Sequence, residues 1–139
     1  MKINENILLQ LCNVAITAGN RVLDFYELDT EIIYKEDESP LTKADLDSNK
    51  ILLSSISKIT PNVPILSEEE FIEWDTRKNW ETYWLIDPLD GTKEFIKKND
   101  EFTINIALIE YNQPVLGIIY APAFGSLFFS KKNNGSYKI

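Results

Sequence analysis

An α+β fold, with helices layered on a mainly antiparallel sheet, is the architecture that the 139-residue sequence predicts. Two observations lead to this prediction. In the first half, apolar residues recur at three- and four-residue steps, which is the spacing of one helix face. In the last third, β-branched and aromatic runs alternate with short turns, which is typical of neighbouring antiparallel strands. Helices followed by a run of hairpins indicate an α+β protein.

Two helices are predicted in the first half. Residues 6–26 place apolar side chains such as Leu11 and Val22 on one face. The second helix begins in "SPLTKAD", where Thr42 and Asp45 resemble a capping box with Asp in place of the usual Glu, and it ends before Pro61. Between the two helices, residues 30–38 (TEIIYKEDE) are expected to form a short strand that runs into an acidic turn.

Short strands dominate the rest of the chain. The strand at 83–87 is expected to stop at Pro88, because proline weakens further pairing. Residues 71–82 mix aromatic and charged side chains and are expected to form an irregular loop or a short helix. No cap, polar tail or partner strand follows the last strand at the end of the sequence, which predicts an absent C-terminal segment. The other expected strands occupy residues 64–66, 102–111, 115–122, 126–132 and 136–139.

The composition is that of an ordinary globular protein of one domain, with 44% apolar and 26% charged residues. The chain has no histidine, so carboxylates, hydroxyls, lysines or a bound ion must supply any chemistry. A net charge of −8 disfavours binding to a nucleic acid polymer, because phosphate contacts need clustered Lys and Arg. The negative charge is still compatible with binding of a small phosphorylated molecule if bound cations reverse the local charge.

The single cysteine, Cys12, fits a reducing compartment and lies in an apolar helical pattern, so a buried structural thiol is expected. No segment reaches the ~18 apolar residues of a membrane span. A cytoplasmic protein without a transmembrane segment is therefore the expectation.

Acidic residues gather at the predicted strand ends. Asp87 and Asp90 follow the apolar run "YWL", and Glu68 follows "PIL". Functional sites tend to lie at strand ends, because a rigid sheet positions the loops that follow. A turn in "DPLDGT" brings Asp87 and Asp90 to the same side, with the carbonyl oxygen of Leu89 between them. Two carboxylates and a carbonyl suit a hard divalent cation, of which Mg²⁺ is the usual one.

Phosphate-binding groups follow directly after these carboxylates. Gly91 and Thr92, at a predicted helix start, offer backbone N–H groups and a hydroxyl to a phosphate oxygen. Asp45, at the start of the second helix, is a fourth acidic candidate. The residues by themselves thus predict a Mg²⁺-dependent site for a phosphorylated ligand.

Each motif also has a structural interpretation. Asp-Pro and Asp-Gly are common turn dipeptides, and "SEEE" by itself resembles a solvated acidic run. Glu69 and Glu70 are accordingly expected to be solvated acids, and Lys35 a solvated lysine. "DPLDGT" and "SEEE" each follow an apolar strand and can converge on one point, which favours a functional site over two unrelated turns. Four aromatic residues are expected in the core or at its rim: Trp80, Tyr83, Trp84 and Phe95.

"WLIDPLDGTKEF" resembles the Asp-Pro-[Ile/Leu]-Asp-Gly-Thr signature of the inositol monophosphatase superfamily. "SPLTKAD" is similar to the Thr-x-x-Asp segment of that family and "ILSEE" to its Glu-Glu segment, so the resemblance covers essentially the whole chain. It implies the N-terminal part of the sugar-phosphatase (αβαβα) fold, with residues 1–139 as the N-terminal metal-binding domain. The C-terminal domain of the family, with a Trp-Asp motif and most of the nucleoside-binding surface, would be absent. The chain alone would then be weakly active or inactive.

The resemblance also implies a metal set. Glu68, Asp87 and the carbonyl of Leu89 would hold one Mg²⁺, and Asp87 with Asp90 would hold a second. Two or more ions are therefore expected, together with inhibition by Li⁺.

The resemblance implies substrate contacts and catalysis by the same motifs. Asp45 and Thr92 would form a hydrogen-bonded pair that orients and deprotonates the attacking water, and Glu68 would contribute to both catalysis and substrate binding. The remaining groups around the scissile phosphate would be Leu89, Asp90, Gly91 and Thr92.

The continuation Lys93-Glu94-Phe95, with "FTINIALI" and "GIIYAP" downstream, resembles the 3′(2′),5′-bisphosphate nucleotidase branch. This implies removal of the 3′-phosphate of adenosine 3′,5′-bisphosphate to give AMP and phosphate, linked to sulfate assimilation. An inositol- or sugar-phosphate phosphatase of the same superfamily and a non-catalytic remnant are the alternatives. The resemblance also allows a homodimer and peripheral association with the cytoplasmic face of the inner membrane.

Overall fold

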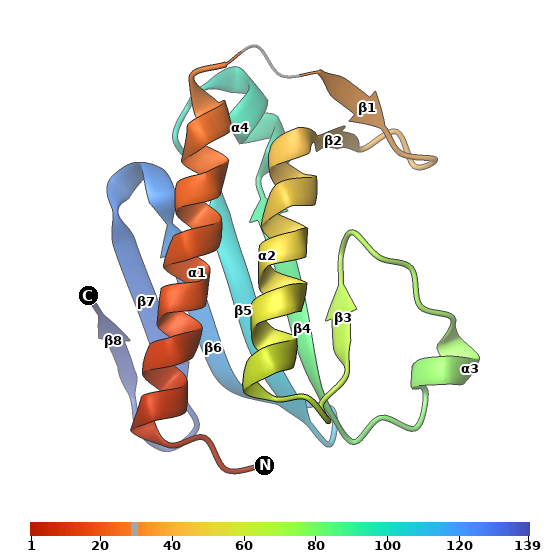
Figure 1. Cartoon of the computed structure of the whole chain (residues 1–139), viewed down its shortest axis with the longest axis vertical. Coiled ribbons are helices and arrows are strands. Elements are labelled where there is room, and N and C mark those ends of the chain that lie inside the picture. Colours follow the sequence, from red (N-terminus) through yellow and green to blue (C-terminus); the bar gives the residue numbers. More distant parts are fainter. Residues whose placement is uncertain (29–30) are drawn as a thin grey trace.

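A pair of long helices packs on one face of a six-stranded sheet in the computed structural model, which describes residues 1–28 and 31–139 (Figure 1). Helix α1 (Glu5–Tyr26) and helix α2 (Lys43–Ile59) lie side by side across the strands. The predicted α+β class, with helices layered on a mainly antiparallel sheet, is confirmed. No helix in the described ranges is long and apolar enough to cross a membrane.

Both helices begin at side-chain caps. Asn4 accepts a hydrogen bond from the backbone N–H of Ile7 at 2.9 Å and starts α1. At α2, the predicted capping box is present: the backbone N–H of Thr42 donates to the Asp45 carboxylate at 2.9 Å, and the Thr42 side chain accepts from the Asp45 backbone. Such caps satisfy backbone N–H groups that have no partner inside the helix. Both helices therefore start where local sequence predicts.

The sheet has the order β3-β4-β5-β6-β7-β8. Strand β3 runs parallel to β4, and every other neighbouring pair in this sheet is antiparallel. The turn between β5 and β6 has positive φ angles at Tyr111 and Asn112, as a two-residue hairpin turn requires. The strands are Ile65–Ser67 (β3), Thr82–Asp90 (β4), Thr103–Glu110 (β5), Gln113–Ala121 (β6), Ser126–Lys131 (β7) and Ser136–Lys138 (β8).

Smaller elements connect these layers. Strand β1 (Ile32–Tyr34) lies within the predicted strand, whose residue Thr30 is outside the described residues, and it pairs with β2 (Pro40–Thr42). Strand β2 was not predicted, because "SPLT" indicates a helix start, although its partner β1 lies only a short turn earlier in the chain. The loop after β3 contains the short helix α3 (Trp74–Arg77), while α4 (Thr92–Lys97) follows β4 and a 3₁₀ turn (Pro122–Phe124) follows β6.

Strand β4 corrects one prediction. It does not stop at Pro88 but continues to Asp90, with a register shift between Asp87 and Asp90. Asp87 lies opposite Asn105 and Asp90 lies opposite Thr103, so three steps along β4 match two along β5. This is a β-bulge, which tolerates proline because part of the bulged segment leaves the ladder.

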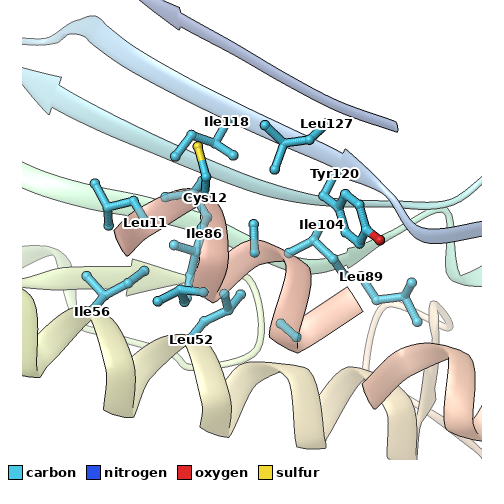
Figure 2. Packing of buried hydrophobic residues seen from close by; sticks show 14 of the residues in the cluster. Leu11, Cys12, Leu52, Ile56, Ile86, Leu89, Ile104, Ile118, Tyr120 and Leu127 are labelled. Atoms are coloured by element: carbon cyan, nitrogen blue, oxygen red, sulfur yellow. The ribbon is translucent and has the colours of Figure 1, made fainter. Parts of the chain in front are cut away.

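The core fills the space between the two helices and the sheet. Leu11 on α1 and Leu52 on α2 face Ile86, Ile104 and Ile118 on the central strands (Figure 2).

Of the four aromatic residues considered in the sequence, Trp84 and Phe95 are fully buried, and Trp80 and Tyr83 are half-buried at the rim. Cys12 is a buried free thiol whose pKa is raised by burial, as a structural role predicts.

The opposite face of the sheet is uncovered in the described structure (Figure 1). Side chains alternate along β5, so that Ile104 and Ile106 point to the helices while Thr103, Asn105 and Ala107 point to the other side. A hollow of about 750 Å³ lies on this second face, and Asp87 and Asn105 line it together with apolar groups. On this face, Asp87 at the start of the bulge in β4 lies opposite Asn105 on β5.

Candidate metal and phosphate site

A pocket of about 230 Å³ lies where β4 ends and α4 begins. It is formed by the end of β3, the bulge of β4, the start of α4 and the β1–β2 hairpin. Six of the seven site residues predicted from the sequence line it, and the seventh, Asp45, is buried behind it. The six are Glu68, Asp87, Leu89, Asp90, Gly91 and Thr92.

The bulge determines how the two aspartates of this pocket are placed. In a regular strand, side chains three residues apart point to opposite faces of the sheet. The extra residue of the bulge reverses this relation, so Asp87 and Asp90 both line the same pocket. The backbone N–H of Leu89 donates to Asp87 Oδ1 at 3.3 Å, and the Leu89 side chain is anchored in the core (Figure 2). The same-side arrangement thus comes from a bulge inside the strand, and not from a turn after it.

Negative charge accumulates around Asp87. Burial, aided by the neighbouring carboxylate of Asp90, raises the pKa of Asp87 to about 6, although the Leu89 N–H opposes the rise. Glu68, an exposed residue at the mouth of the pocket, raises this pKa further. Carboxylates that repel one another in this way are stabilised by a divalent cation.

The oxygen donors of this pocket fit a hard cation such as Mg²⁺. Across residues 1–28 and 31–139, no three Asp, Glu or Cys side chains are already arranged as a complete metal-binding group. The predicted sets need only two carboxylates for each ion, with the carbonyl of Leu89 and other oxygen ligands completing the coordination. The chemistry of the donors is therefore compatible with the prediction.

Asp45 and Thr92 are hydrogen-bonded to each other. Thr92 Oγ1 donates to Asp45 Oδ1 at 2.8 Å and lies 3.3 Å from the carbonyl oxygen of Leu89. The other oxygen of Asp45 accepts from both the backbone N–H and the hydroxyl of Thr42. Asp45 is fully buried, so it can reach a ligand in the pocket only through Thr92. With its proton directed at Asp45, the Thr92 oxygen can accept a hydrogen bond from a ligand.

Gly91 is required at the turn between β4 and α4. Its φ of 89° lies in the left-handed region, which side chains disfavour. A Cβ atom at this position would also lie 2.7 Å from the carbonyl oxygen of Glu101. The glycine of the motif therefore has a steric role in addition to any role in binding.

Lys35 and Glu69 differ from their predictions. Lys35 Nζ lies 2.9 Å from Glu69 Oε2, and the Glu69 side chain is only 4% exposed, so neither group is simply solvated. Glu70 is exposed, as predicted. Burial lowers the pKa of Lys35, but the hydrogen bond and the charge of Glu69 raise it by more, which keeps Lys35 protonated. Burial in turn raises the pKa of Glu69 against the effect of Lys35.

This ion pair forms because the β1–β2 hairpin approaches the end of β3, where both residues line the pocket. The contact joins residues 34 positions apart in the sequence, so local patterns do not predict it. Of the two lysines that line the pocket, Lys35 and Lys93, Lys35 is thus already paired with a carboxylate.

Two supporting residues on α2 were missed. Ser48 Oγ donates to the carbonyl oxygen of Pro88 at 2.7 Å, and Asn49 Oδ1 accepts a hydrogen bond from the Ser67 hydroxyl. Both side chains are buried. They follow Asp45 by three and four residues, so one face of α2 contacts the ends of β3 and β4 and the start of α4. Polar residues on the apolar face of a helix are the sequence signal that could have revealed them.

Comparison with known proteins identifies the family. Residues 3–138 match the model of the inositol monophosphatase family, and the chain belongs to this family. It is 45% identical over 126 residues to the 3′(2′),5′-bisphosphate nucleotidase CysQ of Salmonella typhimurium, which covers 89% of this chain and 51% of that relative. The chain spans about half the length of the curated relatives it matches.

Solved structures agree with this assignment. The crystal structure of CysQ from Bacteroides thetaiotaomicron aligns with a TM-score of 0.80 at 40% identity, over 94% of this chain and 48% of that chain. An IMPase/NADP phosphatase complexed with Mg²⁺ and phosphate aligns with a TM-score of 0.82 at 19% identity, over 96% of this chain and 51% of that chain. At this identity the second likeness shows the fold alone.

Proposed function

We propose that residues 1–139 form the metal- and phosphate-binding domain of a Mg²⁺-dependent phosphomonoesterase. Its substrate would be adenosine 3′,5′-bisphosphate, from which it removes the 3′-phosphate to give AMP and phosphate. The observation that carries the proposal is the pocket in which Asp87, Asp90 and Glu68 meet Thr92, itself held by Asp45. The 45% identity to a 3′(2′),5′-bisphosphate nucleotidase supports the choice of substrate, and with it a role linked to sulfate assimilation.

We further propose that two or more Mg²⁺ ions bind here. Glu68, Asp87 and the Leu89 carbonyl would hold one ion, and Asp87 with Asp90 a second. Bound Mg²⁺ would neutralise phosphate oxygens and lower the pKa of water toward neutrality. The Mg²⁺ and phosphate held by a structural neighbour of the same fold, and the raised pKa of Asp87, support this assignment. Li⁺ would inhibit by competing for the same oxygens.

The protein groups would guide the water and the proton. The Thr92 oxygen accepts a hydrogen bond from the attacking water and directs a lone pair of that water toward phosphorus. As the water oxygen bonds to phosphorus and the bond to the 3′ oxygen breaks, the water proton moves to Thr92 Oγ1, and the departing 3′ oxygen of AMP takes up a proton from a solvent water. The Thr92 proton moves to Asp45 Oδ1, which lies 2.8 Å away. Leu89, Asp90 and Gly91 would line the phosphate, and Glu68 would contact both water and substrate.

Metal binding tests this proposal directly. We expect isothermal titration calorimetry to detect Mg²⁺ binding to the wild-type chain, and Asp87→Asn to weaken it at least about tenfold, because one shared carboxylate is lost. Asp75→Asn is the matched control, since Asp75 is exposed and pairs only with Lys78 among the described contacts. Absence of detectable Mg²⁺ binding to the wild type would contradict the proposal.

Substrate choice needs a second measurement. The isolated chain is expected to release phosphate weakly or not at all, so the full-length protein is assayed. Its phosphate release from adenosine 3′,5′-bisphosphate, inositol 1-phosphate and fructose 1,6-bisphosphate should show the highest kcat/KM for the nucleotide. A preference for the inositol or sugar phosphate would favour the alternative activity in the same family. Metal binding by this chain, together with no release from any of the three by the full-length protein, would favour a non-catalytic remnant.

Location and assembly are further proposals. We propose a cytoplasmic protein, from the family resemblance and the single buried thiol of Cys12. Homodimerisation and peripheral association with the inner membrane remain predictions. Light scattering of the purified chain and sedimentation with anionic vesicles would test them.

A further inference from the structure

We propose that Asn105 and Thr103 on β5 form a positioning pair, which holds the Asp90 carboxylate in the orientation that binds a divalent cation. The inference deepens the proposed function and rests on it for the presence of the cation. Neither residue belongs to the sequence motifs that predict the site. Both were outside the predicted set because nothing local in "FTINIALI" indicates a contact with "DPLDGT".

The hydrogen bonds of the pair have a defined direction. Asn105 Nδ2 donates to Asp90 Oδ2 at 3.1 Å, and Thr103 Oγ1 donates to Asn105 Oδ1 at 2.9 Å. An ionised carboxylate can only accept, so the NH₂ group of Asn105 must be the one that faces Asp90. The hydroxyl of Thr103 then satisfies the amide carbonyl and prevents the amide from turning over. The chain of donors therefore runs from Thr103 through Asn105 to Asp90.

The β-bulge explains why the pair is needed. Asp87 lies opposite Asn105 and Asp90 lies opposite Thr103, so the pair spans the bulged segment on the adjacent strand. Asp90 is exposed at the end of β4, where an unsupported carboxylate would sample several rotamers. Thr103 and Asn105 are two residues apart on a regular strand, so both side chains point to the same face. The regular strand thus orients a carboxylate of the irregular one.

A neutral amide suits this task better than a cation. A Lys or Arg side chain would also bond to Asp90, but its charge would oppose the approach of a metal ion. The amide occupies Oδ2 and adds no charge, while Oδ1 of Asp90 has no hydrogen bond among those described. Partners that orient metal ligands typically change metal affinity by 10–100-fold. The bond itself is exposed, so its removal should change folding stability little.

The test compares Mg²⁺ affinity with stability in four variants of the chain. Asn105→Leu removes the donor at similar volume, Thr103→Val removes the hydroxyl, and Thr103→Ser restores it. Asn13→Leu makes the same change on an exposed position of α1, away from the pocket. Calorimetry gives the Kd for Mg²⁺, and a thermal melt in EDTA gives Tm without metal.

We expect Asn105→Leu to raise the Kd about tenfold and Thr103→Val to raise it by a smaller factor, with most of the affinity restored in Thr103→Ser. The Tm without metal should stay within about 3 °C in all four, and Asn13→Leu should bind as the wild type does.

Equal Kd values for the wild type and Asn105→Leu would overturn the inference and leave the proposed function standing. A Tm that falls together with the affinity would show a structural role and also overturn it, as would a Thr103→Ser variant as weak as Thr103→Val. A wild type that binds no Mg²⁺ would overturn the proposed function, and the positioning role with it.

Discussion

The two sides of the candidate site are built in opposite ways. On the helix side, Asp45 is fully buried, and both of its oxygens accept hydrogen bonds from Thr42 or Thr92. On the pocket side, Asp87 and Asp90 are crowded carboxylates, and Asp87 has a raised pKa. The protein alone stabilises the first arrangement, whereas the second is favourable only when positive charge is supplied. One half of the site is therefore preorganised, and the other half depends on its ligand.

The largest effect is expected from breaking the preorganised side. Asp45→Ala removes the capping box of α2 and leaves the hydroxyl of Thr92 without its acceptor. We expect a loss of about 3 kcal/mol in the free energy of unfolding, measured by urea denaturation without metal. Asp24→Ala is the control, because Asp24 is exposed and its ion pair with Arg21 contributes little. A loss below about 1 kcal/mol would show that Asp45 is not a structural anchor.

Gly91 connects the pocket side, at Asp90, to the helix side, at Thr92, and a substitution there tests this connection. Gly91→Ala forces a side chain into the left-handed region and against the Glu101 carbonyl, so we expect a destabilisation of about 2 kcal/mol. Gly125→Ala provides a matched control, since Gly125 also has a positive φ but open space around its missing Cβ. The difference between the two variants, measured by urea denaturation, isolates the steric contribution. Equal losses would mean that backbone conformation alone requires the glycine at 91.

On the pocket side, removal of a charge should increase the stability of the metal-free protein instead of reducing it. Asp87→Asn removes one of the repelling charges, so we expect it to stabilise the metal-free protein by about 1 kcal/mol. Adding Mg²⁺ should raise the Tm of the wild type and have little effect on the variant, because ligands that bind the native state stabilise it. Thermal melts with and without Mg²⁺ measure both effects, with Asp75→Asn as the surface control. If the metal-free Asp87→Asn protein were less stable than the wild type, the pocket side would not be destabilised by repulsion between its carboxylates.

The smallest change concerns Lys35, the paired lysine of the pocket. Lys35→Met removes a positive charge, so Mg²⁺ should bind about threefold more tightly in calorimetry at low salt. The same variant leaves Glu69 without its ion-pair partner, which should reduce stability by about 1 kcal/mol. Lys58→Met, at an exposed position of α2, is the control. Weaker Mg²⁺ binding by Lys35→Met would show that Lys35 supports the metal site instead of competing with it.

Much of the fold was predictable because its determinants are local. The capping box at Thr42 and Asp45, the apolar face of α1 and the two-residue turn after β5 all depend on residues close in sequence. The continuation of β4 past Pro88 was not predictable in this way, because it depends on the register of β4 against β5. Strand β2 was missed because "SPLT" has the pattern of a helix start.

The same distinction applies to the site. The motif residues from Asp87 to Thr92 are adjacent in the chain, and Asp45 and Glu68 were candidates from their positions at a helix start and a strand end, with their roles supplied by the family resemblance. The groups that orient them were missed, because Ser48, Asn49 and Asn105 act across distances of many residues.

The amino-acid residues alone set the chemistry that is available here: oxygen donors, a threonine hydroxyl, a glycine turn and no imidazole. How these groups face one another depends on the pairing and packing of distant segments. The bulge between Asp87 and Asp90 arises from the register of β4 against β5, and it brings to one side two carboxylates that a regular strand would separate. Register is a property of two paired segments, so neither segment specifies it alone.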